Sequence, residues 1–190
     1  MNIVLASSSP RRQALLNQIG ITFTLRTQTA DESKITEHNP VKKVTKLAQL
    51  KADMTPVYDD EIVITADTIV SCDNEIFEKP EDVDDACRMM TALSGRHHQV
   101  HTAVVLKSKV KSKQILSTTD VYFYELDNDD ILNYIHTNEP YDKAGGYGIQ
   151  STGARFVKKI NGDYCTIVGL PAAEVYHALK NWDESIILND

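Results

Sequence analysis

Hydrophobic and polar positions along the chain follow patterns that predict both strands and helices. Residues 2–6 form a short apolar run, which is typical of a buried strand. A helical pattern then begins at Pro10, with Ser9 in the N-cap position and Gly20 just after its last apolar residue. Residues 21–26 resemble a second strand. The chain therefore opens with a strand, a helix and a strand.

A second helix is predicted to begin at Asn39 and Pro40, and its apolar stripe ends in a charged residue. The stripe consists of Val44, Leu47, Ala48 and Lys51. A lysine in such a stripe either extends along the apolar surface to reach water or meets an anion. Lys51 is therefore expected either at the surface or against a negative charge.

The middle of the chain is predicted to contain long strands and two more helices. Residues 62–66 form a strand that ends at Asp67, and residues 82–93 form a helix with Val83 among its inward-facing positions. Gly95 ends that helix. The other elements predicted here are strands over residues 97–106 and 114–125 and a short helix over residues 127–136.

The last part of the chain is predicted to form a glycine-rich loop, a hairpin and a final helix. The loop covers residues 141–148, and the hairpin joins strands 156–160 and 164–168 through Asn161 and Gly162. A helix follows Pro171 and runs through Trp182. Because hairpins interrupt the alternation of strands and helices, we expect an α/β fold with a mixed sheet in a single domain over residues 1–190.

The composition is that of a globular protein with an acidic surface. Hydrophobic residues make up 42% of the 190 residues, which is enough for a sizeable core. The formal net charge is -7, with 20 Lys and Arg against 27 Asp and Glu. Such a balance argues against binding to a nucleic acid polymer, which needs a basic surface. A small anion can still bind where a few cations meet in one cleft.

The cysteines and the hydropathy favour a cytoplasmic protein. Cys72, Cys87 and Cys165 are odd in number and widely spaced, without the spacing of a zinc site, so we expect free thiols in a reducing compartment. No stretch approaches the roughly 18 apolar residues of a membrane span, and the N-terminus has no signal-peptide pattern. We therefore expect no membrane association.

The strongest candidate for ligand chemistry is the sequence Ser-Ser-Ser-Pro-Arg-Arg at residues 7–12. It lies where a strand passes into a helix, and the first amides of a helix are unpaired and attract negative charge. Arg11 and Arg12 oppose the helix dipole unless an anion joins them. Hydroxyls, free amides and guanidinium groups together indicate a phosphate site. The alternative is a solvated helix start with surface arginines. No P-loop motif is present.

Acidic and basic residues elsewhere in the chain are weaker candidates on their own. Asp67 follows an apolar strand, where α/β sheets often place an active-site carboxylate, although a turn or helix cap is an equally simple role. Glu32 would alone be assigned to a loop, and Lys79 to a surface turn before Pro80. Each of these residues gains meaning only if the fold brings it to the same cleft.

Two further segments need an interpretation. Residues 139–150 combine Lys143, Gln150 and glycines in one loop, which either approaches a ligand closely or is simply mobile. Residues 97–101 contain His97, His98 and His101 but lack the glutamate and the helix of a zinc-protease motif. We therefore expect no metal site at these histidines.

Taken together and in order, these motifs resemble those of the Maf family of nucleotide pyrophosphatases, and most closely its branch that acts on dTTP and UTP. The resemblance covers nearly the whole chain, which makes it far more specific than any single motif. It is carried by residues 5–12, 66–70, 78–80, 93–96, 139–150 and 168–171.

The resemblance implies a fold, a set of site residues and a cofactor. The fold is an elongated mixed α/β structure of the Maf/ITPase-like kind, with two lobes around a central cleft, often found as a homodimer. Asp67 matches the proton acceptor. Glu32 and Asp67 match positions that hold a divalent cation, Mg²⁺ or Mn²⁺. The positions linked to base choice are Arg11, Thr68 and Gln150, and those that bind phosphate are Ser7, Arg12, Lys51, Lys79 and Lys143. Ser8 and Ser151 stand where relatives commonly have glycine.

The expected reaction is hydrolysis of a nucleoside triphosphate to its monophosphate and diphosphate. Gln150 is neutral and offers both a donor and an acceptor, which suits the edge of uracil or thymine. A positively charged base such as 7-methylguanine would be matched better by a carboxylate. The alternatives are a pyrophosphatase for 7-methyl-GTP and a non-catalytic, nucleotide-responsive regulator of cell division. Modified pyrimidine nucleotides are further candidate substrates.

Overall fold

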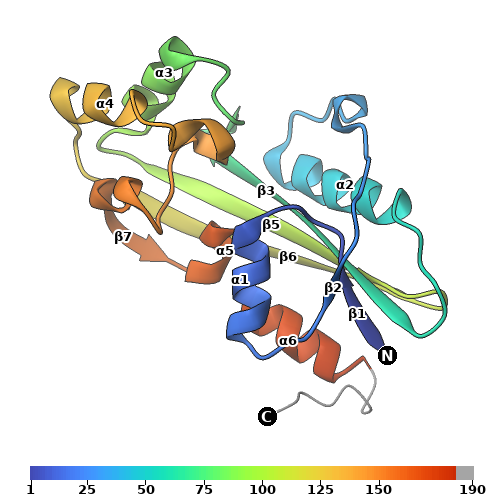
Figure 1. Cartoon of the computed structure of the whole chain (residues 1–190). Helices are drawn as coiled ribbons and strands as arrows, with labels where there is room; N and C mark the ends of the chain where they lie inside the picture. Colours follow the sequence, from blue (N-terminus) through green and yellow to red (C-terminus); the bar gives the residue numbers. More distant parts are fainter. Residues whose placement is uncertain (183–190) are drawn as a thin grey trace.

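The computed structural model describes residues 1–182, which form a seven-stranded mixed sheet with helices on both faces (Figure 1). The strands are β1 (Asn2–Leu5), β2 (Thr24–Leu25), β3 (Glu61–Cys72), β4 (Glu75–Phe77), β5 (His97–Lys107), β6 (Ser112–Phe123) and β7 (Val157–Asn161). Their order is β2-β1-β3-β5-β6-β7, and β4 pairs with β3. The pairing of β1 with β2 and β3 is parallel and the other pairings are antiparallel, so the predicted α/β fold with a mixed sheet is confirmed.

The edge of β3 is covered at both ends but not in the middle. β1 pairs with residues 61–64 and β4 pairs with residues 70–72 on the same side of the strand, because β5 occupies the other side. Residues 65–69 therefore have no partner strand on that edge in the described part of the chain. A ligand can approach the sheet through this interruption.

Helices surround the sheet, and polar caps explain where several of them begin. The helices are α1 (Pro10–Gln18), α2 (Pro40–Asp53), α3 (Val83–Leu93), α4 (Asn128–Ile135), α5 (Tyr164–Val168) and α6 (Ala172–Lys180). Short 3₁₀ turns are η1 (Glu32–Lys34), η2 (Pro140–Asp142), η3 (Ala144–Gly146) and η4 (Thr152–Phe156). Side chains of Asn39, Asp82 and Asp127 accept hydrogen bonds from the first turns of α2, α3 and α4. The segments predicted as these helices are confirmed.

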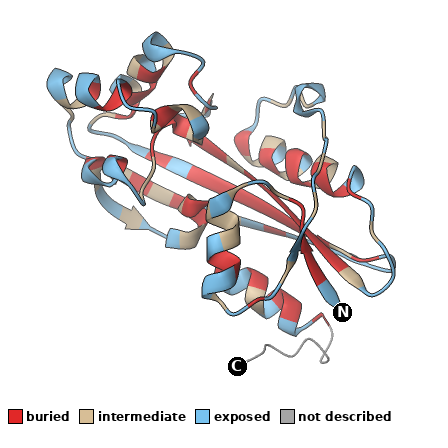
Figure 2. Ribbon diagram, viewed as in Figure 1, coloured by how far each residue is buried: buried red, intermediate tan, exposed pale blue. Residues whose placement is uncertain are grey.

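Alternating side chains of the strands fill the core on the two faces of the sheet. Ile62 and Ile64 of β3 pack with Leu16 of α1 and with α6, whereas Ile69 packs with α2. Figure 2 shows long buried stretches along β3 and β5, whereas buried and more exposed residues alternate along β6. Leu16 and Ile64 are fully buried, and truncation of such a side chain to alanine costs about 2–5 kcal/mol.

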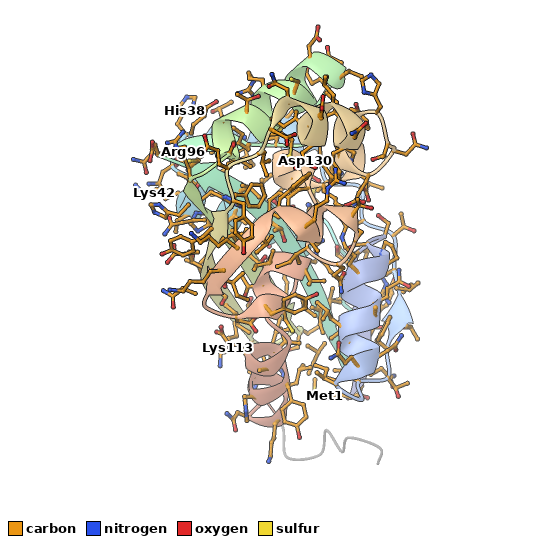
Figure 3. The ribbon with its side chains drawn as sticks, turned by 90° about the vertical axis from the view of Figure 1, so that its left-hand side faces the viewer. Met1, His38, Lys42, Arg96, Lys113 and Asp130 are labelled. Carbon is orange, nitrogen blue, oxygen red and sulfur yellow. The ribbon has the colours of Figure 1, made fainter. Side chains whose placement is uncertain are left out.

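A separate hydrophobic cluster occupies the other end of the long strands. It joins β4, α3, α4 and η4 through Phe77, Met90, Tyr134 and Phe156. Figure 3 shows the resulting elongated shape, with Asp130 of α4 toward one end and Met1 and Lys113 toward the other. The two clusters lie at opposite ends of β3, β5 and β6, as the expected two-lobed fold requires.

Four details of the sequence prediction are wrong. The strand predicted to end at Asp67 continues to Cys72, because β5 pairs with it well beyond the end of β1. Only Thr24 and Leu25 of residues 21–26 form a strand. Val83 is exposed, because the core side of α3 is formed by Ala86, Met89, Met90 and Leu93.

The fourth error is the hairpin predicted around Asn161 and Gly162. β7 pairs with β6 instead, and residues 164–168 form helix α5. The carboxylate of Asp163 accepts hydrogen bonds from the amide and the hydroxyl of Thr166, which starts a helix where a second strand was expected.

No helix in the part of the chain that the structure describes has the length and hydropathy needed to cross a membrane.

Candidate active site

A cavity of about 980 Å³ lies against the uncovered edge of β3, between the start of α1, one face of α2 and the loop around η2 and η3. This volume is large enough for a nucleotide-sized ligand. All the site residues predicted from the sequence line it: Ser7, Arg11, Arg12, Glu32, Lys51, Asp67, Thr68, Lys79, Lys143 and Gln150. The fold therefore brings residues from distant parts of the chain into one cleft.

Arg12 is held in place by neutral groups and faces the cavity with its charge uncompensated at close range. Its guanidinium donates to the Gly169 carbonyl (2.9 Å), the Ser7 hydroxyl (3.2 Å) and the Thr68 hydroxyl (3.3 Å). No carboxylate lies within ion-pair distance of it among residues 1–182. Burial lowers the pKa of Arg12, and the charge of Asp67 opposes this shift only in part. A bound anion would stabilise this side chain.

The start of α1 has the geometry expected of an anion site. Ser9 is the N-cap residue, its side chain makes no capping hydrogen bond, and its own amide donates to the Ser7 hydroxyl (3.2 Å). Arg11, in the first helical turn, forms an ion pair with Asp142 across the cavity (3.0 Å). The first turn of α1 contains no acidic residue, so an anion would find both free amides and positive side chains there.

Lys51, at the end of α2, contacts two carboxylates. Of the two expected positions for this lysine, at the surface or against a negative charge, the structure therefore shows the second. Lys51 is 7% exposed, contacts Asp67 directly and lies 3.0 Å from Glu32. Burial raises the pKa of Asp67 above its ordinary value, although Lys51 and Arg12 oppose the shift. A carboxylate with a raised pKa is better matched to accept a proton near neutral pH.

Lys143 and Gln150 come from the glycine-rich loop on the opposite wall. Lys143 donates to the Glu139 carbonyl (2.8 Å) and to Asp142. Gly145, with φ of 72°, packs where an added Cβ would lie 2.9 Å from Val70, so only glycine fits this approach of the loop to β3. Gln150 is exposed at the cavity wall. Lys79 is exposed beside the buried Pro80.

The carboxylates of Glu32 and Asp67 suit a divalent cation that arrives with a ligand. Both are hard oxygen donors, and both converge on the same ammonium group of Lys51. No cluster of three or more Asp, Glu, His or Cys side chains with metal-site geometry occurs among the described residues. Mg²⁺ is commonly held by only one or two carboxylates together with substrate phosphates, so the pair fits such an ion.

The histidines of β5 have structural contacts. His98 is buried against Tyr147 and Phe123, and its Nε2 lies 2.7 Å from the Tyr147 hydroxyl. Both ring nitrogens of His101 lie 2.9 Å from hydroxyl groups, those of Ser71 and Thr118.

Sequence reasoning assigned no role to two acidic residues: Asp142, which lines the cavity, and Glu139, which contacts residues that line it. Asp142 bridges Arg11 and Lys143, and the carboxylate of Glu139 accepts hydrogen bonds from the chain that follows Gln150. Both belong to the predicted loop, but acidic residues in a loop usually face solvent. The only available signal was their proximity in sequence to Lys143.

An α/β sheet with an interrupted strand edge, lined by clustered cations and two carboxylates, defines a protein built to bind a small polyanion. Comparison with known proteins agrees with this class. A family model described as "Maf-like protein" matches residues 2–182. The chain belongs to the Maf family, as its motifs predicted.

Several relatives are similar over nearly their full length. The dTTP/UTP pyrophosphatase of Vibrio vulnificus (strain YJ016) is 45% identical over 182 residues, covering 95% of this chain and 98% of the relative. The dTTP/UTP pyrophosphatase of Bacillus velezensis is 43% identical over 182 residues, covering 95% and 96%. That of Escherichia coli (strain K12) is 43% identical over 184 residues, covering 96% and 93%.

Proposed function

We propose that this protein hydrolyses nucleoside triphosphates between the α- and β-phosphates, with dTTP and UTP as its substrates. The observation that carries the proposal is one cavity lined both by the carboxylate of Asp67 and by five cationic side chains: Arg11, Arg12, Lys51, Lys79 and Lys143. Relatives at 43–45% identity bear the name dTTP/UTP pyrophosphatase, which supports the same choice.

The cations bind the triphosphate. Arg12 holds phosphate oxygens with the help of the Ser7 hydroxyl, and Lys51, Lys79 and Lys143 neutralise the rest of the chain of phosphates. A hydrogen bond to a charged group contributes roughly 1.5–3 kcal/mol. Several such bonds are sufficient to hold a polyanion in a protein whose net charge is -7.

Asp67 acts as the base. It orients and deprotonates a water molecule for in-line attack at the α-phosphorus, and the bond to the bridging oxygen breaks so that diphosphate leaves. Lys51, in contact with Asp67, stabilises the negative charge that develops on the phosphate oxygens. Glu32 and Asp67 would hold Mg²⁺ or Mn²⁺, which supplies further neutralisation of the phosphates.

The pyrimidine base of the nucleotide binds near Gln150, Arg11 and Thr68. The Gln150 amide can donate to a carbonyl oxygen and accept from the N3–H of uracil or thymine. Modified pyrimidines with the same edge would be bound in the same way. The family resemblance also favours a single domain over residues 1–190, a homodimer and a cytoplasmic location. Light scattering coupled to gel filtration tests whether the protein is a homodimer.

The test is a panel of standard and modified triphosphates, incubated with the pure protein and Mg²⁺ or Mn²⁺, with products identified by ion-exchange chromatography. We expect dTTP and UTP to yield monophosphate and diphosphate faster than the other standard nucleotides. Release of orthophosphate would contradict the proposed bond cleavage. A preference for 7-methyl-GTP would contradict the proposed base, and binding without turnover would favour a regulatory role.

A further inference from the structure

Glu139, which lies between α4 and η2, is the centre of a hydrogen-bond network that organises the loop around Gln150. Its carboxylate accepts four hydrogen bonds: from the Tyr134 hydroxyl (3.0 Å), the Ser151 hydroxyl (2.6 Å), the Thr152 amide (3.1 Å) and the Gly153 amide (3.0 Å). Three of these donors belong to the three residues that follow Gln150 in the chain. The network therefore fixes the backbone directly beside the residue proposed to read the base.

The main chain of Glu139 has a second connection to the site. Its carbonyl accepts a hydrogen bond from the ammonium group of Lys143 (2.8 Å). Glu139 does not itself line the cavity, whereas Lys143, Gln150 and Ser151 do. Glu139, outside the cavity, is thus hydrogen-bonded both to Lys143, a proposed phosphate ligand, and to the segment that follows Gln150, the residue proposed to recognise the nucleobase.

The packing around this network leaves little room for another arrangement of the loop. A Cβ added to Gly153 would lie 2.9 Å from the Gly148 carbonyl oxygen and 3.0 Å from the Tyr134 hydroxyl. Tyr134 is fully buried, so its hydroxyl is a fixed anchor. Burial alone would raise the pKa of Glu139, but hydrogen bonds from Ser151, Gly153 and Tyr134 outweigh it and hold the pKa below its usual value. The network is built for the ionised carboxylate.

We propose that Glu139 is a positioning residue for base selection, which holds Gln150 at the base and Lys143 at the phosphates. This inference rests on the function proposed above. Displacing a recognition group by about 1 Å can cost up to 10²-fold in rate, so a loosened loop is expected to reduce discrimination between bases. Asp67 lies on β3 and contacts Lys51 of α2 rather than this loop, so the chemistry is expected to proceed once substrate is bound.

The experiment compares Glu139→Gln with wild type in steady-state hydrolysis of UTP and CTP. The amide keeps the size of the side chain but replaces one acceptor oxygen with a donor, which the surrounding hydroxyl and amide donors cannot all satisfy. We expect KM to rise for both nucleotides but more for UTP than for CTP, kcat to change less than 3-fold, and the ratio of kcat/KM for UTP over CTP to fall about 10-fold. Ser151→Ala, which removes one of the four bonds, is expected to produce a smaller shift of the same kind.

Glu37→Gln is the matched control. Glu37 also accepts two backbone amides and a charged side chain, those of His38, Asn39 and Lys46, but it lies outside the cavity lining. The Glu37→Gln variant is expected to leave the ratio of kcat/KM for UTP over CTP unchanged. Hydrogen exchange of residues 148–156 should be faster in Glu139→Gln than in Glu37→Gln, which identifies the loop as the site of the change.

A Glu139→Gln protein with wild-type KM and wild-type selectivity would overturn the inference while leaving the proposed function intact. Equal losses of kcat on UTP and CTP with no change in KM would also overturn it, because that pattern indicates damage to the reaction rather than to recognition. Absence of diphosphate release by the wild-type protein would instead refute the proposed function.

Discussion

The two walls of the cavity are built in different ways. On one wall, Arg12, Lys51 and Asp67 extend from helices and a central strand, and Lys51 and Asp67 are buried. On the other wall, Lys143 and Gln150 extend from irregular chain that is held by the carboxylate and carbonyl of Glu139. We propose that the first arrangement holds the phosphates and supports catalysis, and that the second, irregular chain fixed by one carboxylate, presents Gln150 to the nucleobase. The variants below separate the two roles.

The largest effect is expected from Asp67→Asn on the first wall. Loss of a general base lowers rates by about 10²–10⁴-fold, so we expect kcat for UTP to fall at least 10²-fold with selectivity among bases unchanged. Asp120→Asn is the control, because Asp120 of β6 bonds to Gln99 away from the cavity lining. Equal kcat for Asp67→Asn and wild type at saturating UTP would remove Asp67 from the mechanism.

The next largest effect is expected from Arg12→Lys. Lysine keeps the charge but cannot reproduce the three hydrogen bonds to Gly169, Ser7 and Thr68 while facing an anion. We expect KM to rise about 10- to 100-fold for UTP and CTP alike, measured by initial rates of diphosphate release. Arg88→Lys, which changes an exposed ion pair with Glu75, serves as the control. A rise in KM that differs between UTP and CTP would instead mean that Arg12 contributes to recognition of the nucleobase.

On the second wall, Gln150→Glu is expected to change the choice of base. A carboxylate repels the carbonyl oxygens of uracil but attracts a positively charged base. We expect kcat/KM for UTP to fall about 10-fold and the ratio for 7-methyl-GTP over UTP to rise, with kcat for UTP within a few-fold of wild type. Gln18→Glu, at an exposed position at the end of α1, controls for added charge. An unchanged ratio would mean that Gln150 does not face the base.

The smallest effect is expected from mild acidification. As the pH falls, Asp67 on the first wall is expected to be protonated before Glu139 on the second. Burial raises the pKa of Asp67, whereas hydrogen bonds overcome burial and lower the pKa of Glu139. A base works only when deprotonated, so kcat should fall first as the pH drops toward the pKa of Asp67. Glu139 stays ionised until the pH falls below the ordinary glutamate value, so the UTP/CTP selectivity should persist. Selectivity lost before kcat in a pH series would contradict this order.

The two walls also differ in how well their residues and elements could be predicted from the sequence. Residues on the first wall follow strong local signals, such as Pro10 after the N-cap Ser9, and the apolar stripe that ends in Lys51. The length of β3 was underestimated because it depends on pairing with β5, which is distant in sequence. That pairing carries the strand past Asp67, so the carboxylate lies in mid-strand at the uncovered edge.

The second wall was predictable only as a set of residues. The motif around Lys143 and Gln150 was visible, but the bonds from Glu139 to Ser151, Thr152 and Gly153 depend on how the chain folds back after Gln150. The failed hairpin has a related cause, since the capping carboxylate of Asp163 outweighed the turn signal of Asn161 and Gly162. Side-chain hydrogen bonds to nearby amides decide such segments, and hydropathy does not report them.

The central claim is that water, directed by Asp67, attacks the α-phosphorus of a bound triphosphate. Hydrolysis of UTP in ¹⁸O-labelled water, with the products analysed by mass spectrometry, tests this directly. The account predicts a single ¹⁸O atom in UMP and none in diphosphate. Label in diphosphate would show attack at the β-phosphorus, and would contradict the proposed geometry of the site.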